Sequence, residues 1–157
     1  MSKICCFTGH RKITALSQKE MLSRIEKKLI ELIEDKDFTD FRAGGARGFD
    51  SLAALTVLNL KQKYPHIKLH LFLPCKGQER QYSPIEKHIY YYTIAHADSV
   101  KYIQENYSEG VMFARNRALV DGADLCIAYL EKLKGGTYQT VNYAQKNKVK
   151  AINLLKT

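Results

Sequence analysis

The chain reads as six short apolar runs separated by longer stretches whose apolar residues recur three or four positions apart. The short runs predict buried strands, and the spacing between them predicts amphipathic helices with one face in the core. The predicted strands are Lys3 to Thr8, Phe38 to Ala43, Ile67 to Leu73, Ser99 to Ile103, Leu125 to Tyr129 and Val149 to Leu155. The predicted helices begin near Ser17, Phe49, Pro84, Val111 and Thr137.

Strict alternation of strands and helices predicts the fold class. Parallel strands need crossover connections, and right-handed helical crossovers place helices on the faces of the sheet. We therefore expect an α/β fold, a single Rossmann-like doubly wound parallel sheet of about six strands with helices on both faces. If the strand order is 3-2-1-4-5-6, ligands bind at the carboxyl ends of the strands, near the switch between the first and fourth.

Length and charge narrow the class of protein. The 157 residues fit one domain spanning the chain, and a hydrophobic content of 45% is ordinary for a globular protein. The formal net charge of +9 suggests acidic partners such as nucleotides or nucleic acid. Many lysines nevertheless fall at helix-surface spacing, which favours solvated helix faces for most of them.

Several classes of site and location are disfavoured by the sequence. No apolar run is long enough for a signal peptide or a membrane span, so we expect a cytoplasmic protein that makes no membrane contact. The four cysteines, Cys5, Cys6, Cys75 and Cys126, show no C-x-x-C spacing and are predicted to be buried thiols. Histidines and cysteines are scattered, so neither a metal site nor a cofactor is expected.

The most informative stretch is a glycine-rich turn between the second predicted strand and the next helix. It runs Gly44-Gly45-Ala46-Arg47-Gly48 and leads to Asp50. Glycines let the backbone approach a ligand closely, and free amides with the following helix dipole favour an anion such as phosphate. Arg47 would add a charge-assisted contact. The alternative interpretation is a tight turn whose glycines serve backbone geometry alone.

Three further segments should meet this turn at the carboxyl edge of the sheet. They are Thr8-Gly9-His10-Arg11 after the first strand, Arg115-Asn116 near a helix start, and Gly135-Gly136-Thr137 at the opening of the last helix. Together the four segments predict a site for a phosphorylated ligand. The polar stretch from Cys75 to Pro84 has the length of a loop over such a site, or of a plain connector. Neither the G-x-G-x-x-G nor the G-x-x-x-x-G-K-[ST] fingerprint occurs.

These motifs, in this order, resemble a known family. Cys6 to Arg11, the Gly44-Gly45-Ala46-x-Gly48-Phe49-Asp50 turn, Leu73-Pro74-Cys75 with Gln78, Arg115-Asn116-Arg117 and Gly135-Gly136-Thr137 carry the resemblance. The chain resembles the YpsA-like proteins of the SLOG superfamily over nearly its whole length. Their Rossmann-like domains are related to the DNA-processing protein A fold and to the Lonely Guy phosphoribohydrolases.

The resemblance implies binding of a nucleotide or nucleotide-derived ligand, with a sensing role as one form of that function. Of the relatives, DNA-processing protein A binds single-stranded DNA, and its glycine turn is similar to Gly44 to Asp50. The positive charge of the chain suits single-stranded DNA as a partner. Against that alternative, the sequence has no groove-lining pattern of alternating basic and aromatic residues.

Lonely Guy enzymes give the second alternative, hydrolysis of the N-glycosidic bond of nucleoside 5′-monophosphates. They use an arginine and a glutamate that follows a P-G-G-x-G-T motif, which Gly135-Gly136-Thr137 matches only in part. Lys134 stands at the proline position, and the helix from Thr137 to Lys148 contains no acidic residue. Arg115 matches the family's arginine, and Asp50, Glu79 and Asp121 are substitute acids.

The sequence therefore favours a binding protein over an enzyme. Its expected partner is a nucleotide-type small molecule. Gly44, Gly45, Ala46 and Gly136 would offer amides, Thr8 and Thr137 hydroxyls, and Arg11, Arg47 and Arg115 positive charge. Asp50 is expected to orient the loop or to accept a hydrogen bond from a ribose hydroxyl. A pure protein scaffold is a third class, and the sequence leaves open whether apolar helix faces are shared in a homo-oligomer.

Overall fold

The computed structural model describes residues 2–156 as one six-stranded parallel sheet with helices on both faces. The strands are β1 (Ile4–Gly9), β2 (Asp40–Ala43), β3 (Lys68–Leu73), β4 (Ser99–Tyr102), β5 (Leu125–Tyr129) and β6 (Lys150–Asn153). The helices are α1 (Gln18–Asp35), α2 (Phe49–Leu60), α3 (Pro84–His96), α4 (Val111–Val120) and α5 (Gly136–Lys146), with short 3₁₀ turns η1 (Gln78–Gln81) and η2 (Leu154–Lys156). The predicted doubly wound α/β fold is confirmed.

The strand order is β4-β3-β2-β1-β5-β6, so the order 3-2-1-4-5-6 is wrong. The crossover through α3 continues outward in the same direction as the crossovers through α1 and α2, which places β4 beside β3 at the edge. The chain then returns through α4 to β5, which pairs with β1. The order therefore reverses between β1 and β5, and the ligand-binding crevice of such sheets lies outside the strand ends at that point.

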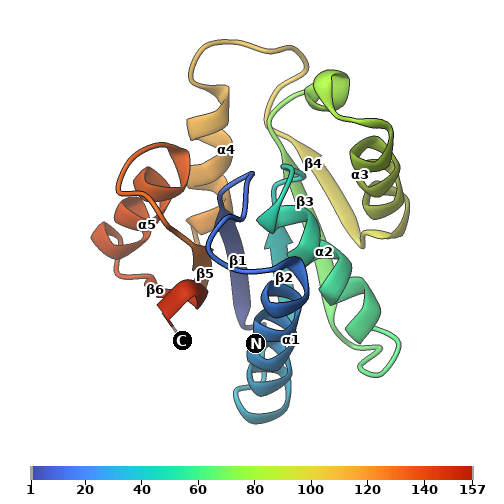
Figure 1. The fold of residues 1–157 in the computed structure, drawn as a ribbon, viewed down its shortest axis with the longest axis vertical. Helices are drawn as coiled ribbons and strands as arrows, with labels where there is room; N and C mark the ends of the chain where they lie inside the picture. The colour runs from blue at the N-terminus through green and yellow to red at the C-terminus, as the bar shows by residue number, and fades with distance from the viewer. Residues whose placement is uncertain (1, 157) are drawn as a thin grey trace.

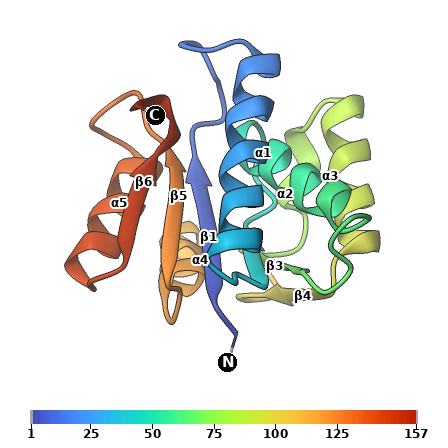
Figure 2. The ribbon, with the colours of Figure 1, turned by 90° about the horizontal axis from the view of Figure 1, so that it is seen from below.

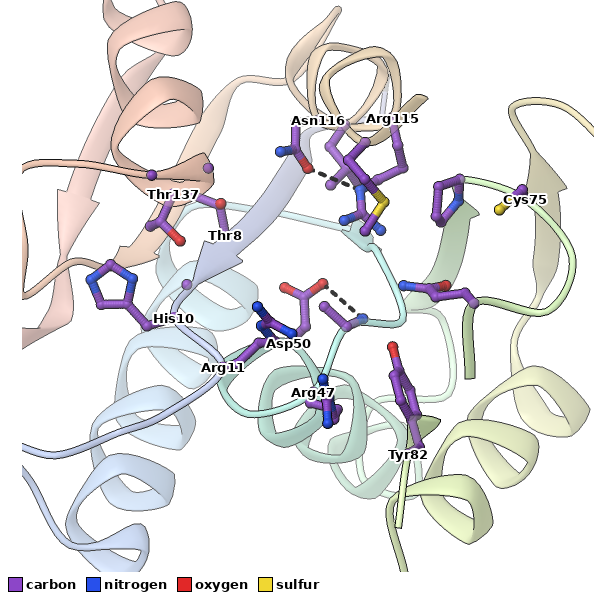
Figure 3. A pocket seen from close by; sticks show the side chains of 18 of the residues that line it. Thr8, His10, Arg11, Arg47, Asp50, Cys75, Tyr82, Arg115, Asn116 and Thr137 are labelled. Atoms are coloured by element: carbon purple, nitrogen blue, oxygen red, sulfur yellow. Dashed lines mark hydrogen bonds between the residues drawn. The ribbon is translucent and has the colours of Figure 1, made fainter. Parts of the chain in front are cut away.

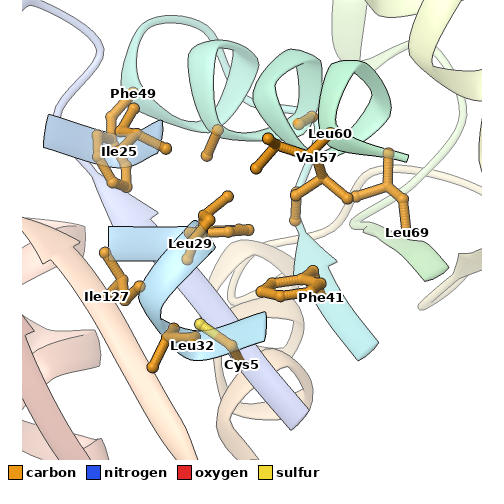
Figure 4. Packing of buried hydrophobic residues seen from close by; sticks show 14 of the residues in the cluster. Cys5, Ile25, Leu29, Leu32, Phe41, Phe49, Val57, Leu60, Leu69 and Ile127 are labelled. Atoms are coloured by element: carbon orange, nitrogen blue, oxygen red, sulfur yellow. The ribbon is translucent and has the colours of Figure 1, made fainter. Parts of the chain in front are cut away.

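The helices fall into two groups. Figures 1 and 2 show α1, α2 and α3 following one another along one side of the sheet, while α4 and α5 lie together away from them. Successive side chains of a strand point to opposite faces. Accordingly, Cys5 and Phe7 join the large core cluster with α1 and α2, while Cys6 joins a smaller cluster with residues of α4 and α5. Figure 4 shows the larger cluster, which joins Ile25 and Leu29 of α1 with Phe49, Val57 and Leu60 of α2.

Two local features fix helix ends. Ser17 Oγ accepts a hydrogen bond from the Glu20 amide at 3.0 Å, so this side chain caps the start of α1, where the sequence predicts a helix to begin. At the carboxyl end of α4, Arg42 from β2 donates hydrogen bonds to the last carbonyls of the helix. Its Nη1 lies 3.3 Å from the Ala118 oxygen, 3.1 Å from that of Leu119 and 2.6 Å from that of Asp121. A strand side chain thus satisfies carbonyls that a helix end leaves without partners.

The cysteines occupy the places that the sequence predicts. All four are buried free thiols. Within residues 2–156, no helix has both the length and the apolar character needed to cross a membrane.

Candidate functional site

A cavity of about 900 Å³ opens at the carboxyl ends of the strands. Of the predicted site residues, twelve line it: Thr8, Gly9, His10, Arg11, Ala46, Arg47, Asp50, Arg115, Asn116, Gly135, Gly136 and Thr137. All four predicted segments therefore contribute to one space (Figure 3). The remaining three, Gly44, Gly45 and Gly48, lie behind the lining, where they pack against other parts of the chain.

The glycine turn is organised around the Asp50 carboxylate. Asp50 Oδ2 accepts the Gly44 amide at 2.9 Å and the Ala46 amide at 3.5 Å (Figure 3). The side chain is only 4% exposed. The two amides, which we expected to face a ligand, thus point to Asp50 instead, and the orienting role predicted for Asp50 is the one that these contacts describe.

Arg115 supports the same turn from α4. Its guanidinium donates to the Gly44 carbonyl through Nη1 and to Asn116 Oδ1 through Nε, the latter at 2.9 Å. A Cβ at Gly44 would lie 2.5 Å from Arg115 Nη1, so only glycine leaves room for this contact. Burial raises the pKa of Asp50 and lowers the pKa of Arg115, while the attraction between their opposite charges opposes both shifts.

The first loop packs closely on the start of α2. Gly48 has a positive φ of 79°, and a Cβ there would lie 2.7 Å from the His10 carbonyl oxygen. The Phe49 amide donates to that same carbonyl at 3.2 Å. The first amide of α2 therefore binds the loop after β1, and it is not free to bind an anion.

The His10 imidazole accepts hydrogen bonds from the loop that leads into α5. Its Nε2 accepts the Glu131 amide at 2.8 Å and the Lys132 amide at 3.2 Å. Because amides only donate, Nε2 must be unprotonated, and the neutral ring carries its proton on Nδ1. Burial lowers the pKa of His10, an effect that the nearby Glu131 carboxylate opposes.

Glu131 also links the loop after β1 to the loop after β5, and no sequence motif marks it as part of the site. Its carboxylate accepts hydrogen bonds from the Thr14 amide and hydroxyl and from the Tyr129 hydroxyl. The Thr14 and Tyr129 hydroxyls lower the pKa of Glu131 to about 2. Glu131 and His10 together hold the β1–α1 and β5–α5 loops in place on one side of the cavity.

The amino terminus of α5 offers the free donors of the site. Its N-cap is Gly135, which has no capping side chain, and among residues 2–156 no acceptor contacts the amides of Gly136, Thr137 and Tyr138. The Thr8 and Thr137 hydroxyls lie beside this end of the helix (Figure 3). Unpaired amides, the positive end of the helix dipole and nearby hydroxyls are the features by which helix starts bind oxyanions.

The charge of the lining favours an anion as well. Among residues 2–156, the cavity lining has six cationic side chains and one carboxylate, that of Asp50. The cationic residues are Arg11, Arg47, Lys76, Arg80, Arg115 and Lys134. A cleft lined by one sign of charge concentrates ligands of the opposite sign. Among residues 2–156, no three histidine, cysteine, aspartate or glutamate side chains gather to hold a metal ion.

Residues of the loop from Cys75 to Pro84 line the cavity, where a loop over the site is expected. Tyr82 donates its hydroxyl to the Gly45 carbonyl at 3.0 Å, and the Arg47 guanidinium lies 5.0 Å from the centre of the Tyr82 ring. Burial is the main cause that raises the pKa of Tyr82 to about 12. Gln78 also lines the cavity, and its Nε2 approaches the Gly44 carbonyl at 3.4 Å.

Tyr107 and Met112 also line the cavity, and they were not predicted from the sequence. Tyr107 is 71% exposed, and it follows the edge strand β4. Its place depends on the return of the chain from that edge toward α4, which the sequence pattern does not determine.

The chain is similar in sequence to a known protein family. The model of the YspA SLOG family matches residues 5–156. The SPbeta prophage-derived protein YoqJ of Bacillus subtilis is 30% identical over 145 residues, which cover 85% of this chain and 83% of that protein. The UPF0398 protein BH1768 of Halalkalibacterium halodurans is 30% identical over 141 residues, which cover 88% of this chain and 71% of that protein.

Solved structures share the fold at lower identity. DNA processing protein A of Helicobacter pylori, described for its single-stranded DNA binding mode, has a TM-score of 0.64 at 20% identity. The match covers 95% of this chain and 63% of that one. The same protein of Streptococcus pneumoniae has a TM-score of 0.64 at 16% identity, with 96% and 49% covered. TM1055 has a TM-score of 0.58 at 15% identity, with 95% and 72% covered.

Proposed function

The chain belongs to the YspA SLOG family, and from that premise we propose that its cavity binds a nucleotide or nucleotide-derived ligand through a phosphate group. The observation that carries the proposal is the amino terminus of α5. There, three amides have no acceptor among residues 2–156, and Gly136, Thr137 and Thr8 line the cavity beside them. Backbone amides at a helix start bind phosphate without a dedicated cation.

The rest of the lining suits the remainder of a nucleotide. Arg11 and Lys134 are exposed cationic side chains at the cavity and supply charge that a phosphate would neutralise. Tyr82 and Tyr107 offer aromatic surface on which a base can stack. Asp50 Oδ2 holds the two amides, which leaves the second carboxylate oxygen to accept from a ribose hydroxyl.

The structure also bears on hydrolysis. Of the three substitute acids, only Asp50 lines the cavity. Glu79 accepts the Tyr91 hydroxyl at 2.6 Å and Asp121 accepts the Tyr143 hydroxyl at 2.7 Å, both away from the lining. Because Asp50 is buried and already bonded to the turn, the arrangement favours binding over catalysis.

A thermal-shift panel at low salt tests the proposal with AMP, ADP, ATP, cyclic nucleotides, NAD, ADP-ribose and a short single-stranded oligonucleotide. At about a hundred times Kd, linkage stabilises the fold by roughly 2.7 kcal/mol, a shift on the order of 5 to 10 °C for this size. A small nucleotide that shifts the melt and is recovered intact supports the proposal. Release of free base would favour the Lonely Guy-like hydrolase, and no shift with any nucleotide would contradict nucleotide binding.

Single-stranded DNA is the second candidate ligand, and two observations favour it. The fold is shared with the DNA processing protein A of Helicobacter pylori, and the net charge is +9. Binding to a DNA backbone weakens steeply with salt because it releases counterions. A melt shift with the oligonucleotide alone that disappears as salt is raised would favour this candidate over a small nucleotide.

A further inference from the structure

A second group of reactive side chains lies on the sheet, outside the cavity. Hydrogen bonds link three side chains across neighbouring strands: Ser99 of β4, His70 of β3 and Asp40 of β2. His70 Nδ1 lies 2.6 Å from Ser99 Oγ, and His70 Nε2 lies 2.7 Å from Asp40 Oδ2. Among residues 2–156, none of the three lines the cavity at the carboxyl ends of the strands, so the proposed nucleotide binding gives them no role.

The strand register places these side chains on one face. His70 and Ser99 are register partners in the parallel β3–β4 pair. Asp40 lies on the same face of β2, since its neighbour Phe41 points into the core cluster on the other face. All four residues of β4 are exposed, so Ser99 is accessible from solvent.

The proton positions follow from the donors and acceptors. Burial alone would raise the pKa of Asp40. Hydrogen bonds from Thr39 and His70 outweigh that effect and hold the pKa below its ordinary value. A charged carboxylate only accepts, so His70 Nε2 carries the ring proton and Nδ1 is the free basic nitrogen. Ser99 therefore donates its hydroxyl proton toward Nδ1, which is the arrangement that activates a serine nucleophile.

We propose that Ser99 is a nucleophile that accepts acyl groups from small activated esters, with His70 as its general base and Asp40 as the group that orients the base. In the acylation step, Ser99 Oγ bonds to the acyl carbon and the bond from that carbon to the ester oxygen breaks. The hydroxyl proton passes to His70 Nδ1 and then to the departing oxygen. Water releases the acyl group by the same route, which restores Ser99 and yields a carboxylic acid.

The neighbours of Ser99 suit such a step. Lys101 lies two residues further along β4, so it shares a face with Ser99, and its ammonium lies 5.9 Å from the centre of the Phe72 ring. We expect this cation to attract the negative charge that develops on the acyl oxygen. Phe72, the register partner of Lys101, adds apolar surface for the acyl chain.

The test uses p-nitrophenyl acetate as the acyl donor. We expect release of p-nitrophenol together with an acetyl group on the peptide that contains Ser99, detected by mass spectrometry. Ser99→Ala should abolish that adduct, and His70→Gln and Asp40→Asn should slow its formation at least about tenfold. Ser99→Cys keeps a nucleophile beside the base and should still be acetylated.

Ser23→Ala is the matched control, because Ser23 is an exposed serine on α1, which packs on the other face of the sheet from His70. Melting temperatures of all variants report whether the sheet is intact. Acetyl groups confined to lysines in the wild type would overturn the proposal. So would an undiminished rate in a folded His70→Gln variant, since Ser99 would then react without its base.

Discussion

The Arg115 guanidinium and the Gly44 carbonyl share a hydrogen bond that joins α4 to the glycine turn across 71 residues of sequence. Arg115 is 5% exposed, so its charge is held within the fold. The residue thus supports the wall of the cavity in addition to lining it, so we expect its removal to lower stability in addition to weakening the proposed ligand binding.

We expect Arg115→Met to lower the free energy of unfolding by about 2 kcal/mol, because the Gly44 carbonyl loses its charged donor in a buried place. For a chain of this length the melting temperature falls by roughly 4 to 8 °C. Differential scanning calorimetry without ligand measures this change. Arg117→Met is the control, since Arg117 is exposed on the same helix. Equal melting temperatures for the two variants would contradict a supporting role for Arg115.

Gly44→Ala should be destabilising by about 1 to 3 kcal/mol, because the added Cβ would lie 2.5 Å from Arg115 Nη1 and 2.9 Å from Asp50 Oδ2. Gly136→Ala is the matched comparison, because the nearest atom to its added Cβ, Asn116 Nδ2, is 3.8 Å away. Urea unfolding of both variants provides the measurement. A larger loss for Gly136→Ala than for Gly44→Ala would be inconsistent with the packing described.

Stability should fall as pH drops below about 6.5, the ordinary pKa of histidine, because the pKa of His10 is lowered in the fold. In that range the unfolded chain binds a proton that the folded chain resists, so unfolding becomes easier toward acid pH. His10→Gln keeps a hydrogen-bond acceptor and removes this titration. Chemical denaturation from pH 7.5 to 5.5 should therefore give a flatter curve for the variant, and parallel curves would exclude His10 as the cause.

Thr137→Val should weaken nucleotide binding about fivefold, because it removes one neutral hydrogen bond worth roughly 1 kcal/mol while keeping the side-chain shape. Isothermal titration calorimetry with whichever nucleotide shifts the melt provides the measurement. Thr56→Val is a control with the same chemistry at a buried threonine on α2, whose hydroxyl donates to the Leu52 carbonyl. An equal loss of affinity in both variants would remove Thr137 from the phosphate position.

The pattern of apolar residues predicted all six strands and all five α-helices described, because that pattern reflects burial along each element. The place of β4 was not predictable in the same way, since β4 beside β3 and β4 beside β1 require the same alternation of strands and helices. The position of Tyr107 depends on that choice. The four loops that line the cavity could be predicted from the sequence, because parallel strands bring their carboxyl ends to one edge of the sheet.

Roles within the glycine turn were less predictable than its position. A Gly-Gly-Ala sequence indicates accessible amides, but only the folded chain brings Asp50 within 2.9 Å of the Gly44 amide. His10 similarly combines a loop position with an acceptor role toward Glu131 and Lys132, residues more than a hundred positions away. Such contacts depend on tertiary distances that no local spacing encodes.

Arg42 links the secondary structure of two distant segments, and this has a consequence for how the protein opens. The last carbonyls of α4 have Arg42 of β2 as their donor, so the final turn of α4 is complete only while β2 is paired in the sheet. The carboxyl end of α4 and the middle of the sheet should therefore lose amide protection together in native-state hydrogen exchange, as one cooperative unit.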